Sequence, residues 1–224
     1  MTVIAIAPRH NRPGINPHTR RPYRDADEFR REAHAFAQLH GGRVFVFDNH
    51  KEPAARFADV VDWLTPMRGI EAAGFFCHGL KASIQVGAGV KNAHVLAATL
   101  RSCGVRAVPL YACETARDLD GDRKDDEDDG PGGAGGFASV LVRALGGDCH
   151  VDAHTRSGHT SRLPFVRRFY ANDDTDAGHW LVEPGSALWR TWKAALRDDR
   201  DFRLSFPLLS QEAIAAYLSA RQVA

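Results

Sequence analysis

Short apolar runs alternate with segments of helical periodicity through the first two thirds of this 224-residue chain, and this alternation constrains the fold more than any other feature. Five runs rich in β-branched and aromatic residues have the length of buried strands. Parallel neighbours need long crossover connections, and a strand buried on both faces loses its polar alternation. We therefore expect a mostly parallel sheet with helices on both faces. The predicted strands are residues 2–7, 43–48, 72–77, 106–112 and 149–153.

Helix-period segments lie between and after these runs. The first predicted helix begins at Asp25, with Glu28 three residues on as a carboxylate version of the capping box, and ends at a pair of glycines. After the fifth strand the pattern turns polar, and two more helices are expected, capped by Ser186 and Ser210. The three remaining helices carry apolar faces within residues 57–64, 93–103 and 137–145, each ending before a proline or a glycine.

Composition and length indicate the class of protein and the number of domains. Apolar residues make up 44% and charged residues 25%, so collagen-like, coiled-coil and wholly disordered chains are excluded. The length favours one domain with one sizeable core. We expect a single domain over residues 1–224 with a three-layer α/β fold. Its core covers about residues 43–153, and a C-terminal helical extension, about residues 154–224, packs on the same core.

Charge and cysteine content limit the partners and the compartment. The 29 basic and 28 acidic residues leave a net charge of +1, which gives no global field to attract nucleic acid or an anionic membrane. No apolar stretch reaches membrane-spanning length. The four cysteines include no C-x-x-C pair and are too few for a disulfide scaffold. We expect a cytoplasmic protein that binds neither nucleic acid nor membrane; the oligomeric state is not predicted.

Two of the predicted strands end in reactive side chains. His78 and Gly79 follow the third strand, and Cys113 follows the fourth, so that both groups meet at one edge if the strands are neighbours. A thiolate is a nucleophile, an imidazole can take up its proton and protonate a leaving amine, and a glycine lets a backbone N–H approach an oxyanion. This pattern predicts a catalytic pair. The alternative is a structural thiol and a strand-end histidine held by backbone groups.

The same residues carry a resemblance to a known family. The segment 74–79, Gly-Phe-Phe-Cys-His-Gly, resembles the hydrophobic block with His-Gly of caspase-like (clan CD) cysteine peptidases. The segment 108–116 resembles the hydrophobic block with Ala-Cys-Glu-Thr of their CHAT-domain branch, and the order of His before Cys also matches. The resemblance covers about residues 44–153. It implies a caspase-like fold and a thiol protease, with Cys113 as nucleophile, His78 as proton donor and acceptor, and the N–H groups of Gly79 and Cys113 as oxyanion donors.

Further polar side chains are expected near this pair. His154, Arg156 and His159 follow the fifth strand, where they can bind a substrate carboxylate or phosphate. Glu114, next to the thiol, is also a candidate substrate-binding residue, and His154 is an alternative base for Cys113. A zinc site is not favoured, because the spacing of the two histidines lacks the glutamate of a zincin. Ordinary surface polarity is the remaining interpretation.

An acidic segment follows the cysteine strand. Residues 118–129 hold eight acidic side chains and two basic ones. They attract basic substrate side chains, or they bind calcium through Asp118, Asp120 and Asp122. The sixth position is Arg123, where an EF-hand has glycine, so we favour a solvated loop and expect no other cofactor.

These observations predict a cysteine endopeptidase that hydrolyses a protein or peptide substrate through an acyl-enzyme, with cleavage after Arg or Lys. Two alternatives stay open. One is a binding module that kept the fold and lost catalysis. The other is a Cys-dependent amide hydrolase that pairs Cys113 with His154. No G-x-C-x-G sequence surrounds Cys113, so a strained nucleophile turn is not indicated.

Overall fold

A computed structural model describes residues 2–10, 20, 28–117, 135–157, 160–173 and 175–222. Seven of the strands in these ranges form one sheet, in the order β2-β1-β3-β6-β7-β8-β9. A separate short hairpin pairs β4 with β5. The strands are β1 (Val3–Pro8), β2 (Arg43–Phe47), β3 (Ala72–Phe76), β4 (Gly79–Leu80), β5 (Ser83–Ile84), β6 (Ala107–Tyr111), β7 (His150–His154), β8 (Val166–Tyr170) and β9 (His179–Trp180).

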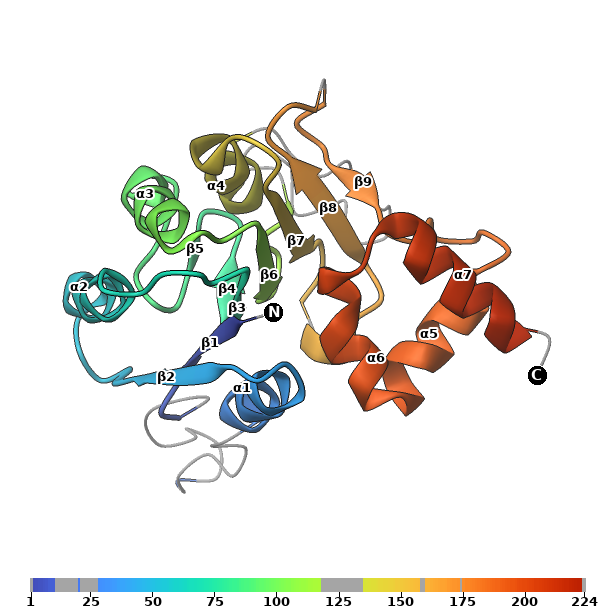
Figure 1. The fold of residues 1–224 in the computed structure, drawn as a ribbon, viewed down its shortest axis with the longest axis horizontal. Coiled ribbons are helices and arrows are strands. Elements are labelled where there is room, and N and C mark those ends of the chain that lie inside the picture. The colour runs from blue at the N-terminus through green and yellow to red at the C-terminus, as the bar shows by residue number, and fades with distance from the viewer. Residues whose placement is uncertain are drawn as a thin grey trace.

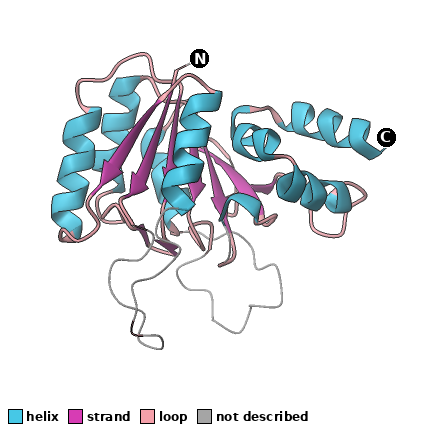
Figure 2. Ribbon diagram, turned by 90° about the horizontal axis from the view of Figure 1, so that it is seen from below, coloured by secondary structure: helices cyan, strands magenta, loops and turns pink. Residues whose placement is uncertain are grey.

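The sheet is mostly parallel, as predicted. β2, β1, β3, β6 and β7 run in the same direction, and Figure 2 shows their arrowheads at one edge. All five predicted strands are confirmed. β8 and β9, which pair antiparallel at the far end of the sheet, were not predicted. β1 lies between β2 and β3, so the predicted strand at residues 2–7 is an interior strand of the sheet.

Helices cover both faces of this sheet and give the three-layer α/β architecture. Figure 1 shows α2, α3 and α4 on one side and α1 with α6 on the other. α3 ends where Gly104 adopts a φ of 96°, a left-handed conformation that favours glycine. The helices are α1 (Glu28–Leu39), α2 (Pro53–Leu64), α3 (Ala93–Cys103), α4 (Phe137–Leu145), α5 (Trp189–Asp198), α6 (Arg200–Ser205) and α7 (Gln211–Gln222).

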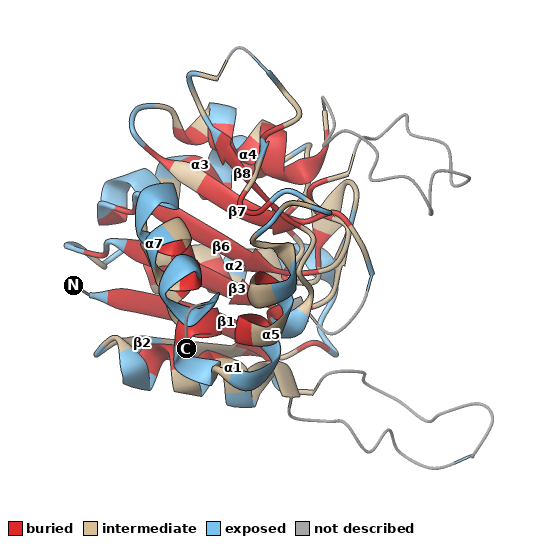
Figure 3. Ribbon diagram, turned by 90° about the vertical axis from the view of Figure 1, so that its right-hand side faces the viewer, coloured by how far each residue is buried: buried red, intermediate tan, exposed pale blue. Residues whose placement is uncertain are grey.

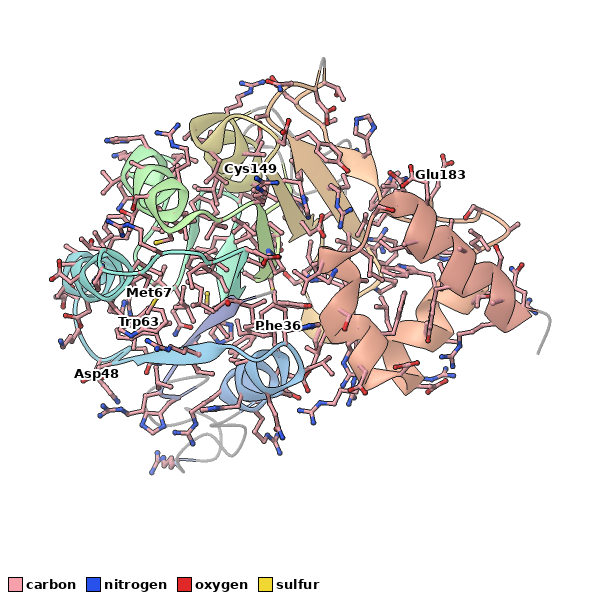
Figure 4. All side chains as sticks on the ribbon, in the orientation of Figure 1. Phe36, Asp48, Trp63, Met67, Cys149 and Glu183 are labelled. Atoms are coloured by element: carbon pink, nitrogen blue, oxygen red, sulfur yellow. The ribbon has the colours of Figure 1, made fainter. Side chains whose placement is uncertain are left out.

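Each face of the sheet has its own apolar cluster. The larger one joins the sheet to α2, α3 and α4, and the smaller one joins it to α1, where Phe36 is fully buried. Figure 4 shows Trp63 and Met67 near α2 and Phe36 on α1. Figure 3 shows β1, β3, β6 and β7 as buried. The removal of these apolar side chains from water is the main force that holds the layers together.

The C-terminal helices pack in part on the core of the sheet, through Leu204 of α6, and also form a third apolar cluster of their own. Trp192 is fully buried there, and its indole N–H donates to the Pro164 carbonyl at 2.8 Å. The predicted cap at Ser210 is confirmed, because its Oγ accepts from the Ala213 N–H at 3.2 Å. The cap at Ser186 is wrong, since α5 begins after Leu188 with no side-chain cap. Asp25 lies outside the described residues.

No helix in the described ranges has the length and apolar character needed to cross a membrane; the longest have 12 residues.

Candidate active site

The structure places His78 and Cys113 just beyond the ends of two neighbouring parallel strands. In the register of β3 with β6, Phe76 is opposite Tyr111, and the Cys77 N–H donates to the Tyr111 carbonyl at 3.4 Å. His78 lies two residues after Phe76, and Cys113 lies two residues after Tyr111. Neighbouring strands lie about 4.8 Å apart, so the two residues leave the sheet side by side. Both are half-buried.

Gly79 is in direct contact with the segment that carries Cys113. A Cβ atom added to Gly79 would lie 2.5 Å from the Cys113 carbonyl oxygen and 2.8 Å from the Ala112 Cβ. Both distances are shorter than real side chains allow. The residue after His78 is therefore restricted to glycine, and its lack of a side chain lets the two segments touch.

The backbone is strained immediately after the cysteine. Glu114 has a φ of 56°, in the left-handed region that costs a non-glycine residue about 1–2 kcal/mol. Such strain concentrates at functional turns. The sequence gives no sign of this strain, because no glycine-rich elbow surrounds the cysteine. The side chain of Glu114 accepts a 2.5 Å hydrogen bond from the Ser157 hydroxyl and lies 3.7 Å from Arg117.

Two residues that the sequence did not single out contact His78. Gln85 binds both backbone polar groups of His78. The Gln85 Oε1 accepts from the His78 N–H at 3.2 Å, and the Gln85 N–H donates to the His78 carbonyl at 2.8 Å. Phe29 of α1 meets the imidazole edge-on, with ring centroids 5.0 Å apart. No sequence pattern points to either contact, because both depend on the tertiary fold.

Cys113 differs from the other three cysteines in exposure. All four are free thiols, and Cys77, Cys103 and Cys149 are buried whereas Cys113 is half-buried. Burial raises the pKa of Cys77 to about 12, and it also raises the pKa of Cys103 and Cys149. These three thiols are poor nucleophiles at neutral pH. Cys113 is thus the thiol best placed to react.

The segment after β7 lies beside the cysteine turn, as the topology predicted. The Glu114 N–H donates to the Arg156 carbonyl at 3.4 Å, and the Ala116 N–H donates to the His154 carbonyl at 3.0 Å. The Arg156 guanidinium stacks over Phe165, 3.8 Å from the ring centroid. Glu114, His154 and Arg156 are therefore brought together near Cys113.

His154 lies in the interior rather than on the surface. Its side chain is 3% exposed, its ring is 6.5 Å from that of Tyr111, and its Nδ1 has no hydrogen-bond partner among the described residues. Burial lowers the pKa of His154 to about 4, against a smaller opposing effect of Asp152. A histidine in this environment is a weak base, which favours His78 over His154 as the partner of Cys113.

Several predicted residues lie outside the described ranges: His159 and the proposed calcium ligands Asp118, Asp120 and Asp122. Among the residues that the structure describes, no group of three or more His, Cys, Asp or Glu side chains is arranged to hold a metal ion.

Comparison of the chain with protein-family models, with curated proteins and with solved structures gives no match.

Proposed function

We propose that this protein is a caspase-like cysteine endopeptidase in which Cys113 attacks the peptide bond and His78 transfers the protons. One observation carries the proposal: the His78-Gly79 segment is packed against Cys113 at the ends of neighbouring parallel strands, with no room for a side chain at Gly79. The strained turn at Glu114 is further support, since it holds the residue after the nucleophile in a conformation of high energy.

The proposed reaction uses only groups of this chain, the substrate and water. His78 takes the thiol proton of Cys113, and the sulfur attacks the carbonyl carbon, forming a C–S bond. The N–H groups of Gly79 and Cys113 donate to the oxyanion. As the C–N bond breaks, the leaving amine takes the proton from His78. Water then gives one proton to His78 and its oxygen to the thioester, which releases the acid product and the thiolate.

We extend the proposal to specificity and compartment. The eight acidic residues within 118–129 support cleavage after Arg or Lys, because they attract cations toward the cysteine strand. Four free thiols support a reducing, cytoplasmic compartment. The near-neutral net charge supports a protein or peptide substrate rather than nucleic acid. Preferred cleavage after Asp or Leu in a peptide library would contradict the basic specificity.

Thiol labelling with iodoacetamide at pH 6 tests the nucleophile without knowledge of a substrate. An unperturbed thiol is almost fully protonated at this pH. We expect rapid modification of Cys113 alone, located by mass spectrometry, and slower modification in His78→Ala. His94→Ala, which removes an exposed histidine on α3, is the matched control and leaves the rate unchanged. Equal rates in His78→Ala and wild type contradict the pairing.

Activity against a fluorogenic peptide library tests the reaction itself. We expect Cys113→Ala to abolish cleavage and His78→Ala to lower it by about 10²–10⁴-fold, with both variants still folded by circular dichroism. Loss of activity in His154→Ala with normal cleavage in His78→Ala supports the alternative base instead. If wild type cuts no peptide, and wild type and Cys113→Ala bind peptides equally well, the protein is a binding module.

A further inference from the structure

A pocket of about 830 Å³ opens on the His78 side of the candidate active site. Its described lining comes from the start of α2, the β4–β5 hairpin and the loop that leads to α3. His78 and Gly79 belong to this lining, whereas Cys113 does not. The volume is within the range of pockets that bind small ligands or ligand side chains. The pocket has no part in the proposed proton transfers of His78 and Cys113.

The chemistry of the lining is apolar with positive charge. Leu80, Ile84 and Val90 supply apolar surface, and Leu80 is 63% exposed, which is unusual for a large apolar side chain. Arg56 and Lys91 add two cations, and the described lining includes no Asp or Glu. The Arg56 Nε is buried without a hydrogen-bond partner among the described residues. Such a pocket attracts apolar groups and repels cations.

We propose that this pocket binds the apolar side chain of the substrate residue that follows the scissile bond. The proposal rests on the proposed function, in which His78 protonates the leaving amine. The leaving segment therefore passes on the His78 side of the thiol, where the pocket opens. An apolar first side chain of that segment enters the pocket. A Lys or Arg side chain at the same position is excluded from it by the positive charge of the lining.

Transfer of the acyl group to added amines tests the pocket separately from cleavage. The acyl-enzyme reacts with water or with an amino acid amide; in the second case the amine nitrogen attacks the thioester carbon, the C–N bond forms, the C–S bond breaks and the amine proton passes to His78. The probes are leucinamide, glycinamide and lysinamide at equal concentrations. The readout is the ratio of transfer product to hydrolysis product by mass spectrometry. We expect about tenfold more transfer to leucinamide than to either other amide.

Two variants assign the preference to this pocket. Leu80→Ala is expected to reduce the leucinamide preference severalfold, whereas Leu39→Ala, the same change at an exposed leucine of α1 outside the pocket, leaves it unchanged. Lys91→Glu is expected to raise transfer to lysinamide, and Lys193→Glu on α5 is its control.

The outcomes separate the two proposals. Equal transfer to all three amides by an enzyme that cleaves its substrate overturns the pocket assignment and leaves the proposed function intact. An unchanged preference in both Leu80→Ala and Lys91→Glu overturns it as well. Absence of any acyl-enzyme or cleavage overturns the proposed function, and the pocket assignment fails with it.

Discussion

The inner parallel strands β1, β3 and β6 and the antiparallel strand β8 are buried to a similar degree but are held by different chemistry. β1, β3 and β6 are buried along their whole length and consist of apolar residues, glycine and proline. β8 reads Val-Arg-Arg-Phe-Tyr, and four of its five residues are buried, including both arginines. Arg168 is 1% exposed and binds Asp152 of β7 through two hydrogen bonds of 2.7 and 2.8 Å.

The same guanidinium also fixes the C-terminal helices to the sheet. Arg168 donates to the Leu209 carbonyl at 2.8 Å and to the Pro207 carbonyl at 3.3 Å. Desolvation lowers the pKa of Arg168, but the neighbouring Asp152 outweighs it and raises the pKa above the ordinary value. The hydrophobic effect does not depend on the direction of a contact, whereas a hydrogen bond requires a defined distance and angle between donor and acceptor. Burial of apolar surface thus accounts for the interior of β1, β3 and β6, whereas β8 and the chain packed on it depend on specific polar partners in addition to apolar burial.

The largest expected effect comes from removing one partner of this buried ion pair. Arg168→Met leaves the Asp152 carboxylate buried without its counter-ion, which we expect to cost about 3–5 kcal/mol in the free energy of unfolding. Urea denaturation measures this change. The control is Arg197→Met, which breaks the exposed pair with Asp198 and is expected to cost less than about 1 kcal/mol. If the two variants lose the same free energy of unfolding, the buried ion pair does not hold β8 in the way expected of specific polar partners.

The difference between the regions explains what the sequence could predict of the fold. The sequence located all five parallel strands, because β1, β2, β3 and β6 are mostly apolar and β7, His-Val-Asp-Ala-His, is apolar at alternate positions. β8 was missed because Arg167 and Arg168 read as surface residues. Only the tertiary fold makes their burial favourable: Arg168 pairs with Asp152 of the neighbouring strand, and Arg167 donates to the Ala177 and Gly178 carbonyls. The separate apolar cluster under α5–α7 was missed for a related reason: helix faces are visible in the sequence, but the surface that each covers is not.

The second prediction concerns pH and His154, at the boundary between the regions. Its pKa is lowered to about 4 in the folded protein by burial, whereas it is about 6.5 in an unfolded chain. Between these values the unfolded state binds a proton that the folded state does not. Stability is therefore full above pH 6.5 and falls with pH toward 4, by on the order of 3 kcal/mol from this group.

Denaturation of wild type and His154→Gln across this pH range measures that contribution. We expect the variant to lose less stability than wild type between pH 6.5 and 4, because the group that titrates is gone. His94→Gln changes an exposed histidine and is expected to follow the wild-type curve. If stability falls with pH equally in wild type and His154→Gln, His154 is not the group that lowers stability between pH 6.5 and 4.

The third prediction tests the contact between the His78 and Cys113 segments. Gly79→Ala introduces a Cβ against the Cys113 carbonyl, so one segment has to shift. We expect a loss of about 1–3 kcal/mol by urea denaturation, together with slower thiol labelling of Cys113. Gly41→Ala is the control: alanine is strained there by the φ of 67°, but no atom lies within 4 Å of the added Cβ, so we expect a loss of stability without slower labelling of Cys113. Normal labelling in Gly79→Ala contradicts a contact that positions the thiol.

The candidate site was predictable only to the level of strand ends. The spacing of two apolar runs placed His78 and Cys113 at one edge, and the parallel register of β3 with β6 is the physical reason. The contacts of Gln85 and Phe29 with His78, and the burial of His154, depend on how loops and layers pack. Local sequence carries no information about those distances, which arise from tertiary structure.

The smallest expected effect is a reversal of sign at Glu114. Glycine usually destabilises a protein relative to alanine, by about 1 kcal/mol in a helix interior, and we expect this order for Lys193→Gly and Lys193→Ala on α5. At Glu114 the φ of 56° disfavours every residue with a Cβ. Glu114→Gly is therefore expected to be more stable than Glu114→Ala by about 1 kcal/mol, since both variants lose the Ser157 hydrogen bond equally. If glycine is the less stable variant at both positions, the turn after Cys113 is unstrained, and the support that it gives to a nucleophile at this place disappears.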